Sequence, residues 1–165
     1  MRVLAGRSTE VSQYVEDVKS VVIYAKNGVI EILPGHQNLY TTVSNNIVEV
    51  LRDSEDTKIT FVLFKGIVSI SSKSKQQTKN TEVVFLCEDF IKIDKDTSPF
   101  QVDLLTTELE KITRKLSELK TLFASNDSLA DEKIKDELND SFLYYTKRLE
   151  FIELAITITK KKFIS

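Results

Sequence analysis

Residues 28–43, GVIEILPGHQNLYTTV, lead from a short run of branched apolar residues into a Pro-Gly pair, and they contain the only histidine of the chain, His36. Branched residues favour strands, and the pair Pro34-Gly35 suits a tight turn. The stretch therefore predicts a strand over residues 29–33 that ends in a turn. A single short strand is not stable alone, so the surrounding sequence has to supply its partners.

The first half of the chain repeats this pattern. Runs of five to seven residues, rich in branched and aromatic side chains, alternate with polar breaks at residues 26–28, 45–46 and 71–80. Many short strands with turns at close intervals indicate an antiparallel sandwich or barrel. The polar segment 71–80, SSKSKQQTKN, predicts an extended hairpin loop. The predicted strands are residues 18–24, 29–33, 47–51, 58–64, 66–70 and 81–87.

The period of the apolar residues changes after Ile93. Residues 94–99, DKDTSP, form a polar linker that ends in proline, and two helical stripes follow. Ser128 and Asp131 have the spacing of a capping box at the start of the second helix. The sequence thus predicts a β domain over 1–93, and a linker with an antiparallel helical hairpin over 94–165. The stripes are Val102, Leu105, Leu109, Ile112, Leu116, Leu119 and Phe123, then Ile134, Leu138, Phe142, Tyr145, Leu149, Ile152 and Ile156.

The composition argues against several classes of partner. The chain carries 23 basic and 25 acidic residues, a formal net charge of -2, which gives no general attraction for nucleic acid or an anionic membrane. The aromatic residues of the first half lie within apolar runs, as core residues do, so nucleic acid is not an expected partner. No apolar run approaches the roughly 20 residues needed to cross a bilayer.

Catalytic, metal and cofactor sites are not predicted either. His36 has no recognisable nucleophile to activate, and one histidine plus the single Cys87 falls short of a zinc set. Cys87 lies in the apolar run 83–87, which predicts a buried thiol. The four glycines stand too far apart for a phosphate-binding loop. From the residues alone, the chain reads as a protein-binding adaptor or regulatory subunit.

Residues 28–43 also carry a family resemblance. The glycine-containing strand, the segment Ile32-Leu33-Pro34-Gly35-His36 and the residues that follow resemble the signature of the epsilon subunit of F-type ATP synthases. The resemblance continues in order through the strands at 61–70 and 83–89 to the two helices, with 148–154, RLEFIEL, similar to the last helix of that family. It covers nearly the whole chain.

The resemblance implies an N-terminal antiparallel β-sandwich of about ten strands followed by a helical hairpin. It implies a non-catalytic rotor subunit of the central stalk that couples rotation, without a cofactor. The sandwich then contacts the gamma subunit, and the hairpin reaches the alpha and beta subunits and restrains ATP hydrolysis. Such a subunit is peripheral, on the cytoplasmic face of the bacterial membrane, within an F1 complex.

Three departures from the family pattern leave alternatives open. Val29 stands where many members carry an acidic residue that meets the c ring, and Glu31 replaces the second glycine of the signature. Ile93-Asp94 lacks the Arg-Ala that completes the nucleotide-sensing pattern. The c-ring contact is therefore open, and the alternatives are a specialised F1-like ATPase without an ordinary c ring or a stand-alone adaptor. The candidate contact residues are Val29, Glu31, His36, Gln37, Asn38, Lys147, Arg148, Lys160, Lys161 and Lys162.

Overall fold

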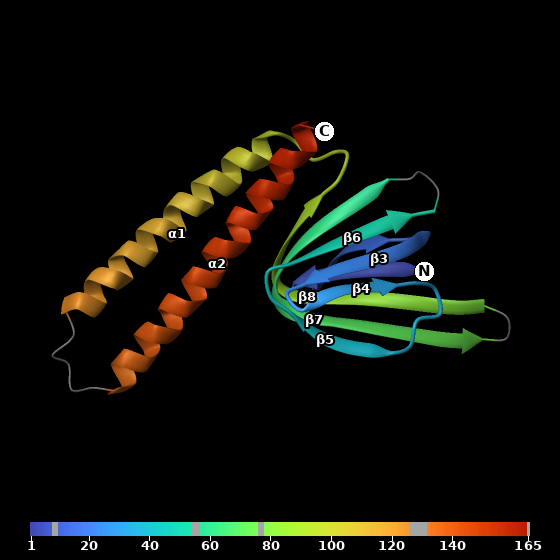
Figure 1. The fold of residues 1–165 in the computed structure, drawn as a ribbon, viewed down its shortest axis with the longest axis horizontal. Coiled ribbons are helices and arrows are strands. Elements are labelled where there is room, and N and C mark those ends of the chain that lie inside the picture. The colour runs from blue at the N-terminus through green and yellow to red at the C-terminus, as the bar shows by residue number, and fades with distance from the viewer. Residues whose placement is uncertain (8–9, 54–56, 76–77, 126–131, 165) are drawn as a thin grey trace. The chain divides into compact units, whose positions relative to one another are not determined.

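The computed structural model describes residues 1–7, 10–53, 57–75, 78–125 and 132–164. The chain divides into two compact units, Met1–Thr97 and Ser98–Ser165. The first unit holds the strands and the second holds two helices (Figure 1). In the described residues no helix is long and apolar enough to span a membrane.

The first unit is a β-sandwich. Its strands follow the order β2-β1-β8-β7-β6-β3-β4 across the sheet, and β5 pairs with β7. All pairs are antiparallel except β1 with β8, which is parallel. The strands are β1 Arg2–Arg7, β2 Glu10–Val15, β3 Val18–Ala25, β4 Gly28–Ile32, β5 Leu39–Val43, β6 Asn46–Arg52, β7 Lys58–Lys75 and β8 Thr78–Ile93.

The two long strands β7 and β8 belong to both layers. Residues 58–63 of β7 pair with β6, whereas residues 66–70 pair with β5. In β8, residues 82–87 pair with β1. The change of layer occurs at Lys65, which has a positive φ of 38°, and there the β7–β8 ladder skips one pair between Phe64↔Asp89 and Gly66↔Cys87. One layer contains β4, β3, β6, residues 58–64 of β7 and residues 89–93 of β8, and the other contains β5, β2, β1 and the remaining parts of β7 and β8.

The sandwich and the two following helices confirm the predicted fold class, with two corrections to the sheet. The described residues form eight strands rather than the roughly ten that the resemblance implied, and the predicted runs 58–64 and 66–70 are parts of one strand, β7. The sheet is mixed rather than antiparallel, because β1, the first strand of the domain, pairs in parallel with β8, its last strand.

The predicted loop at 71–80 is wrong for the residues that are described. The ladder continues from Ser71↔Glu82 to Lys75↔Thr78, so β7 and β8 extend through most of this polar segment. Pairing of the two backbones satisfies their N–H and C=O groups whatever side chains they carry, and a polar hairpin is stable as a strand pair for that reason. Residues 76 and 77 lie outside the described residues.

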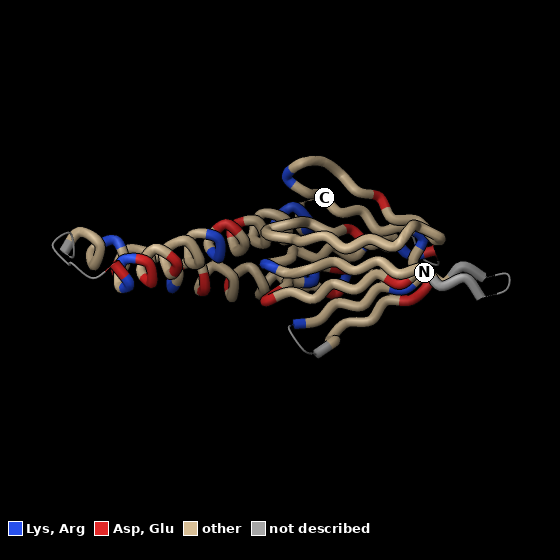
Figure 2. Tube along the Cα trace, turned by 90° about the horizontal axis from the view of Figure 1, so that it is seen from below, with Lys and Arg blue, Asp and Glu red and all other residues tan. Residues whose placement is uncertain are grey.

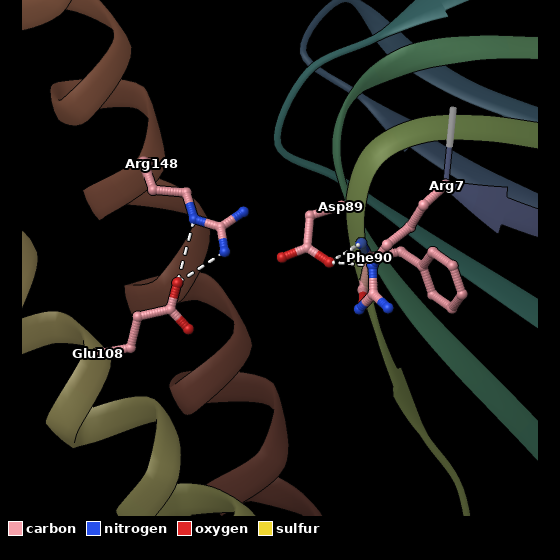
Figure 3. Close-up of polar contacts among 5 residues, drawn as sticks. All are labelled: Arg7, Asp89, Phe90, Glu108 and Arg148. Carbon is pink, nitrogen blue, oxygen red and sulfur yellow. Dashed lines mark hydrogen bonds and ion pairs between the residues drawn. The ribbon is translucent and has the colours of Figure 1, made fainter. Parts of the chain in front are cut away.

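The core lies between the two layers. Alternate residues of each strand point inward, and Phe61 packs with Phe85 and Phe90 at ring-centroid separations of 6.4 and 6.0 Å. Arg7 joins β1 to the neighbouring strand β8. Its Nε lies 2.7 Å from Oδ1 of Asp89, and its guanidinium lies over the ring of Phe90 (Figure 3). Cys87 is buried in the core, as predicted.

The second unit is the predicted antiparallel helical hairpin. Helix α1 spans Phe100–Ser125 and helix α2 spans Glu132–Ile164. The start of α1 follows the Ser98-Pro99 pair, where the Ser98 hydroxyl accepts a hydrogen bond from the N–H of Phe100 at 3.3 Å. The predicted capping box at 128–131 lies outside the described residues. Of the predicted stripes, Leu105, Ile112, Leu116, Leu119, Ile152 and Ile156 are buried, whereas Ile134 is exposed.

The two helices pack along these stripes. The rings of Phe123 and Phe142 meet edge to face with centroids 6.0 Å apart. The branched residues near the end of α2 do not end the helix, which continues to Ile164. Hydroxyl groups of Thr157 and Thr159 instead donate to the carbonyl oxygens four residues earlier, at 2.8 and 2.7 Å.

Candidate interaction surface

The Pro-Gly segment forms a closed turn between β4 and β5. The N–H of His36 donates to the carbonyl oxygen of Leu33 at 3.0 Å, which makes Pro34 and Gly35 the two central residues. Gly35 has a φ of +87°, and proline followed by a residue of positive φ is the pattern of a type II turn. A side chain at position 35 is therefore strained, because L residues rarely adopt this conformation.

Hydrogen bonds tie this turn to the β7–β8 hairpin. The N–H of Gly35 donates to Oγ1 of Thr81 at 2.6 Å, and the Ser72 hydroxyl donates to the carbonyl of His36 at 2.6 Å. The two hydroxyls lie 3.0 Å apart. The Ser72 N–H donates to Oδ1 of Asn38 at 2.8 Å. Since Thr81 is only 1% exposed, the network fixes the β4–β5 connection from inside the fold.

His36 is part of this connection. Its Nδ1 lies 2.7 Å from the carbonyl oxygen of Gln37, so that nitrogen carries the proton and donates. The residue is partly exposed, and Gln37 and Asn38 beside it are exposed. The three candidates therefore lie together on one ordered connection, in which Asn38 also stabilises the hairpin.

Val29 and Glu31 lie elsewhere, on the edge strand β4. Both point away from the core, because Ile32 is buried and Ile30 packs against the core cluster. Val29 is 62% exposed and is paired with Tyr24 of β3. Val29, which replaces the acidic residue of the signature, is thus an exposed apolar group on the solvent side of the layer that contains β4.

The basic candidates of α2 are engaged to different degrees. Arg148 donates to Oε1 of Glu108 in α1 through Nε at 3.2 Å and Nη2 at 2.6 Å (Figure 3). Its guanidinium also lies 5.0 Å from the ring centroid of Phe151. Lys147 forms an ion pair with Glu150 at 3.1 Å, and Lys162 lies 5.2 Å from the ring centroid of Phe163. Lys160 and Lys161 are exposed close to the end of the helix.

A larger surface was not anticipated from the sequence. We call it the outer face: the solvent side of the layer formed by β5, β1, β2 and the parts of β7 and β8 that pair with them. Paired residues share one side of a sheet, and those opposite the core form two rows across five strands. The first row is Tyr40, Ser69, Val84, Leu4 and Tyr14, and the second is Thr42, Ile67, Leu86, Gly6 and Val11.

The outer face is apolar and accessible. Tyr40 is 75% exposed, Tyr14 51%, Val11 48% and Ile67 45%. The uninterrupted apolar run 83–87 is the one signal in the sequence for this face, because a strand with one wet side normally alternates polar and apolar residues. Figure 2 shows that charged residues occur all along the helices, whereas the middle parts of the strands are mostly uncharged.

Polar pairs border the outer face at both ends. At one end, Arg2 forms an ion pair with Glu82 at 2.5 Å, and the Tyr14 hydroxyl donates to Glu16 at 2.6 Å. The hydrogen bond with Tyr14 and the charge of Glu82 raise the pKa of Arg2, and the hydrogen bond to Glu16 raises the pKa of Tyr14. At the other end, Lys65 lies 3.8 Å from Glu88. An apolar centre within a polar rim is the usual anatomy of a protein interface.

Comparison with known families identifies the domain that carries this face. A family model described as "ATP synthase, Delta/Epsilon chain, beta-sandwich domain" matches residues 7–92. The chain belongs to this family. The matched residues include the Pro-Gly turn of the ATP synthase delta/epsilon domain and the residues of the outer face other than Leu4 and Gly6.

One solved structure shows the same fold. A chain in a cryo-EM structure of the Euglena gracilis mitochondrial ATP synthase, with OSCP, F1 and c-ring, has a TM-score of 0.53 and 17% identity, over 94% of this chain and 79% of that one. A chain of the Tetrahymena thermophila mitochondrial ATP synthase central stalk and c-ring has a TM-score of 0.38 and 7% identity, over 90% and 95%. Comparison with curated proteins finds no match.

In the described part of this delta/epsilon-family chain, no three His, Cys, Asp or Glu side chains are grouped to hold a metal ion. Burial, and secondarily the charge of Asp89, raise the pKa of the Cys87 thiol to about 12. A thiol that keeps its proton is a poor nucleophile.

Proposed function

We propose that this chain is a non-catalytic central-stalk subunit of an F-type ATP synthase or F1-ATPase, and that its outer face docks on the gamma subunit. The observation that carries the proposal is the apolar outer face with its polar rim, on a domain of the delta/epsilon family. The complex would place the chain peripherally at the cytoplasmic side of a bacterial membrane.

The outer face has the chemistry that docking requires. Tyr40 and Tyr14 of the first row give large, stiff side chains that bury much apolar surface at small entropic cost, and Ile67 belongs to the second row beside them. Removing such anchors typically weakens a complex by at least about 2 kcal/mol. The carbonyl and amide groups beneath these side chains are already paired in the sheet, so docking leaves no backbone group unsatisfied.

The docking test uses two charged variants. Tyr40→Asp and Ile67→Asp each place a carboxylate on the proposed contact, and we expect each to weaken binding to purified gamma subunit at least thirtyfold, which corresponds to about 2 kcal/mol. Asn27→Asp adds the same charge in the exposed β3–β4 turn and serves as the matched control. Isothermal titration gives the dissociation constants, and unchanged affinity in both variants would refute docking through this face.

We further propose that the helical hairpin restrains ATP hydrolysis. The apolar stripes that pack α1 and α2 together can pack equally well on helices of another subunit. Lys160, Lys161 and Lys162 give the end of α2 a positive charge suited to acidic groups on alpha and beta subunits. Truncation after Thr97 removes the whole second unit at its natural boundary. We expect the rate of ATP hydrolysis by the assembled complex to rise. An unchanged rate would show that the hairpin does not restrain hydrolysis and would favour a structural role for it.

The contact with a c ring separates the synthase from a specialised F1-like ATPase. Val29 is exposed on β4, and the native Cys87 is buried, so a cysteine at position 29 is the reactive thiol of a Val29→Cys variant. Cross-linking of that variant in membranes to a c subunit supports the synthase. A complex that purifies with alpha, beta and gamma subunits, and gives no such product, supports the specialised form.

A further inference from the structure

A pocket of about 520 Å³ lies at the Arg2–Glu82 end of the outer face. Arg2, Tyr14 and Glu82 belong both to the pocket wall and to that end of the face, so the two surfaces are continuous. Its volume falls within the range of sites that hold a small molecule or a large side chain. The side chains that matter are Arg2, Tyr14, Glu16, Asp17, Thr81 and Glu82.

The charges of the pocket favour a cation. Three carboxylates, on Glu16, Asp17 and Glu82, line the pocket together with two cations, the guanidinium of Arg2 and the N-terminal ammonium carried by Met1. Arg2 is satisfied by Glu82, and Glu16 accepts the hydroxyl of Tyr14. Within the described residues, Asp17 forms no side-chain hydrogen bond or ion pair. The carboxylates thus outnumber the cations, which disfavours phosphate and carboxylate ligands, and the exposed Asp17 carboxylate has no side-chain partner among the described residues.

The backbone around Asp17 holds this acceptor in place. Asp17 has a φ of 53°, and its carbonyl oxygen accepts the N–H of Asp53 at 2.8 Å. The next residue, Val18, donates its N–H to the carbonyl of Met1 at 3.0 Å. A carboxylate presented from a fixed turn loses little backbone freedom when it binds a partner.

We propose that this pocket receives an arginine side chain of the protein that docks on the outer face. A guanidinium can stack on the exposed ring of Tyr14 while its planar N–H groups donate to the Asp17 carboxylate. A bare metal ion fits less well, because in the described residues the acidic side chains do not converge into a metal-holding group. The inference rests on the proposed function and adds the chemistry of the partner at one end of the contact.

The pocket is tested first without any partner. N-acetyl-arginine amide is titrated into the ¹⁵N-labelled full chain, and amide shifts are followed by NMR, with N-acetyl-citrulline amide as the uncharged analogue. We expect saturable shifts at residues 16, 17 and 81 with the arginine probe alone, and their loss in Asp17→Asn. Equal shifts with citrulline, no shifts, or shifts that persist in Asp17→Asn would overturn the proposal. Asparagine tolerates positive φ, so this variant keeps the turn.

The complex gives the second test. Asp17→Asn should weaken gamma binding about tenfold, the loss expected for one charge-assisted hydrogen bond, and the difference should shrink at high salt. Glu110→Gln removes the same charge from an exposed site on α1 and should leave the affinity unchanged. If gamma binds wild type and Asp17→Asn equally, the pocket proposal fails and docking stands. If wild type does not bind gamma, the proposed function fails, while the arginine titration still decides the pocket.

Discussion

Arg148 of α2 donates two hydrogen bonds to one carboxylate oxygen of Glu108 in α1, although forty positions separate the two residues. The Arg148 side chain is only 16% exposed and that of Glu108 is 40% exposed, so solvent screens the pair less than an ordinary surface ion pair. The contact joins the middle of both helices. An ion pair between two defined positions of the helices favours this register.

Breaking this pair should weaken the hairpin measurably. In a double-mutant cycle with Arg148→Gln and Glu108→Gln, we expect a coupling free energy of about 1 kcal/mol from urea unfolding followed by helical circular dichroism. The exposed Lys115–Glu118 pair within α1 is the control, and its own cycle with Lys115→Gln and Glu118→Gln should give a coupling free energy below about 0.5 kcal/mol. A coupling no larger than that of the control pair would show that the Arg148 contact does not stabilise the hairpin.

Gly66 should tolerate no side chain. A Cβ at this position would lie 2.3 Å from the carbonyl oxygen of Leu86 and 2.7 Å from Cys87, both on the neighbouring strand. Since the blocking atoms include backbone, the strands have to move apart, and we expect Gly66→Ala to cost about 1–3 kcal/mol of unfolding free energy. Thermal unfolding beside Ser69→Ala, three positions along the same strand on its outer side, checks this. Equal melting temperatures of the two variants would contradict it.

Thr81→Val should loosen the Pro-Gly turn. The substitution keeps the shape but removes the oxygen that accepts the Gly35 N–H and lies beside the Ser72 hydroxyl. A buried donor left without its acceptor costs about 1–3 kcal/mol. Amide hydrogen exchange at Gly35 should accelerate in this variant and stay unchanged in Thr42→Val, which alters an exposed threonine of β5. Unaltered protection of Gly35 in Thr81→Val would show that another group holds the turn.

The Cys87 thiol should make the sandwich less stable in alkali. Its pKa in the folded chain is about 12, against an ordinary value of 9.0, so the folded state keeps the proton that the unfolded state releases. The stabilisation is therefore complete below pH 9 and declines between pH 9 and 12, by at most about 1.4 kcal/mol per pH unit. Urea unfolding from pH 7.5 to 10.5 should fall more steeply for the native chain than for Cys87→Ala. Parallel slopes would contradict the prediction.

Several features followed from the sequence because their causes are local. The turn at Pro34-Gly35 depends on a proline, whose φ is fixed, and a glycine, which adopts positive φ easily. The structure shows this turn where it was expected. The helices were predicted from apolar residues that recur at steps of three and four, and the buried thiol was predicted from its apolar neighbours in the sequence. Strands β1, β2 and β5 were not predicted individually, because polar residues interrupt their short apolar patterns.

Other features depend on which segments become neighbours, and only the tertiary structure decided them. The parallel pairing of β1 with β8 joins residues about eighty positions apart, and that pairing gathers Tyr40, Ile67, Leu4 and Tyr14 on one outer face. The partner of Arg148 could not be predicted either, because the sequence does not show which acidic residue of the facing helix lies opposite it. The sequence by itself determined the periods, the turn and the family signature. The long-range register, which cross-strand and interhelical packing sets, decided which side chains form a surface.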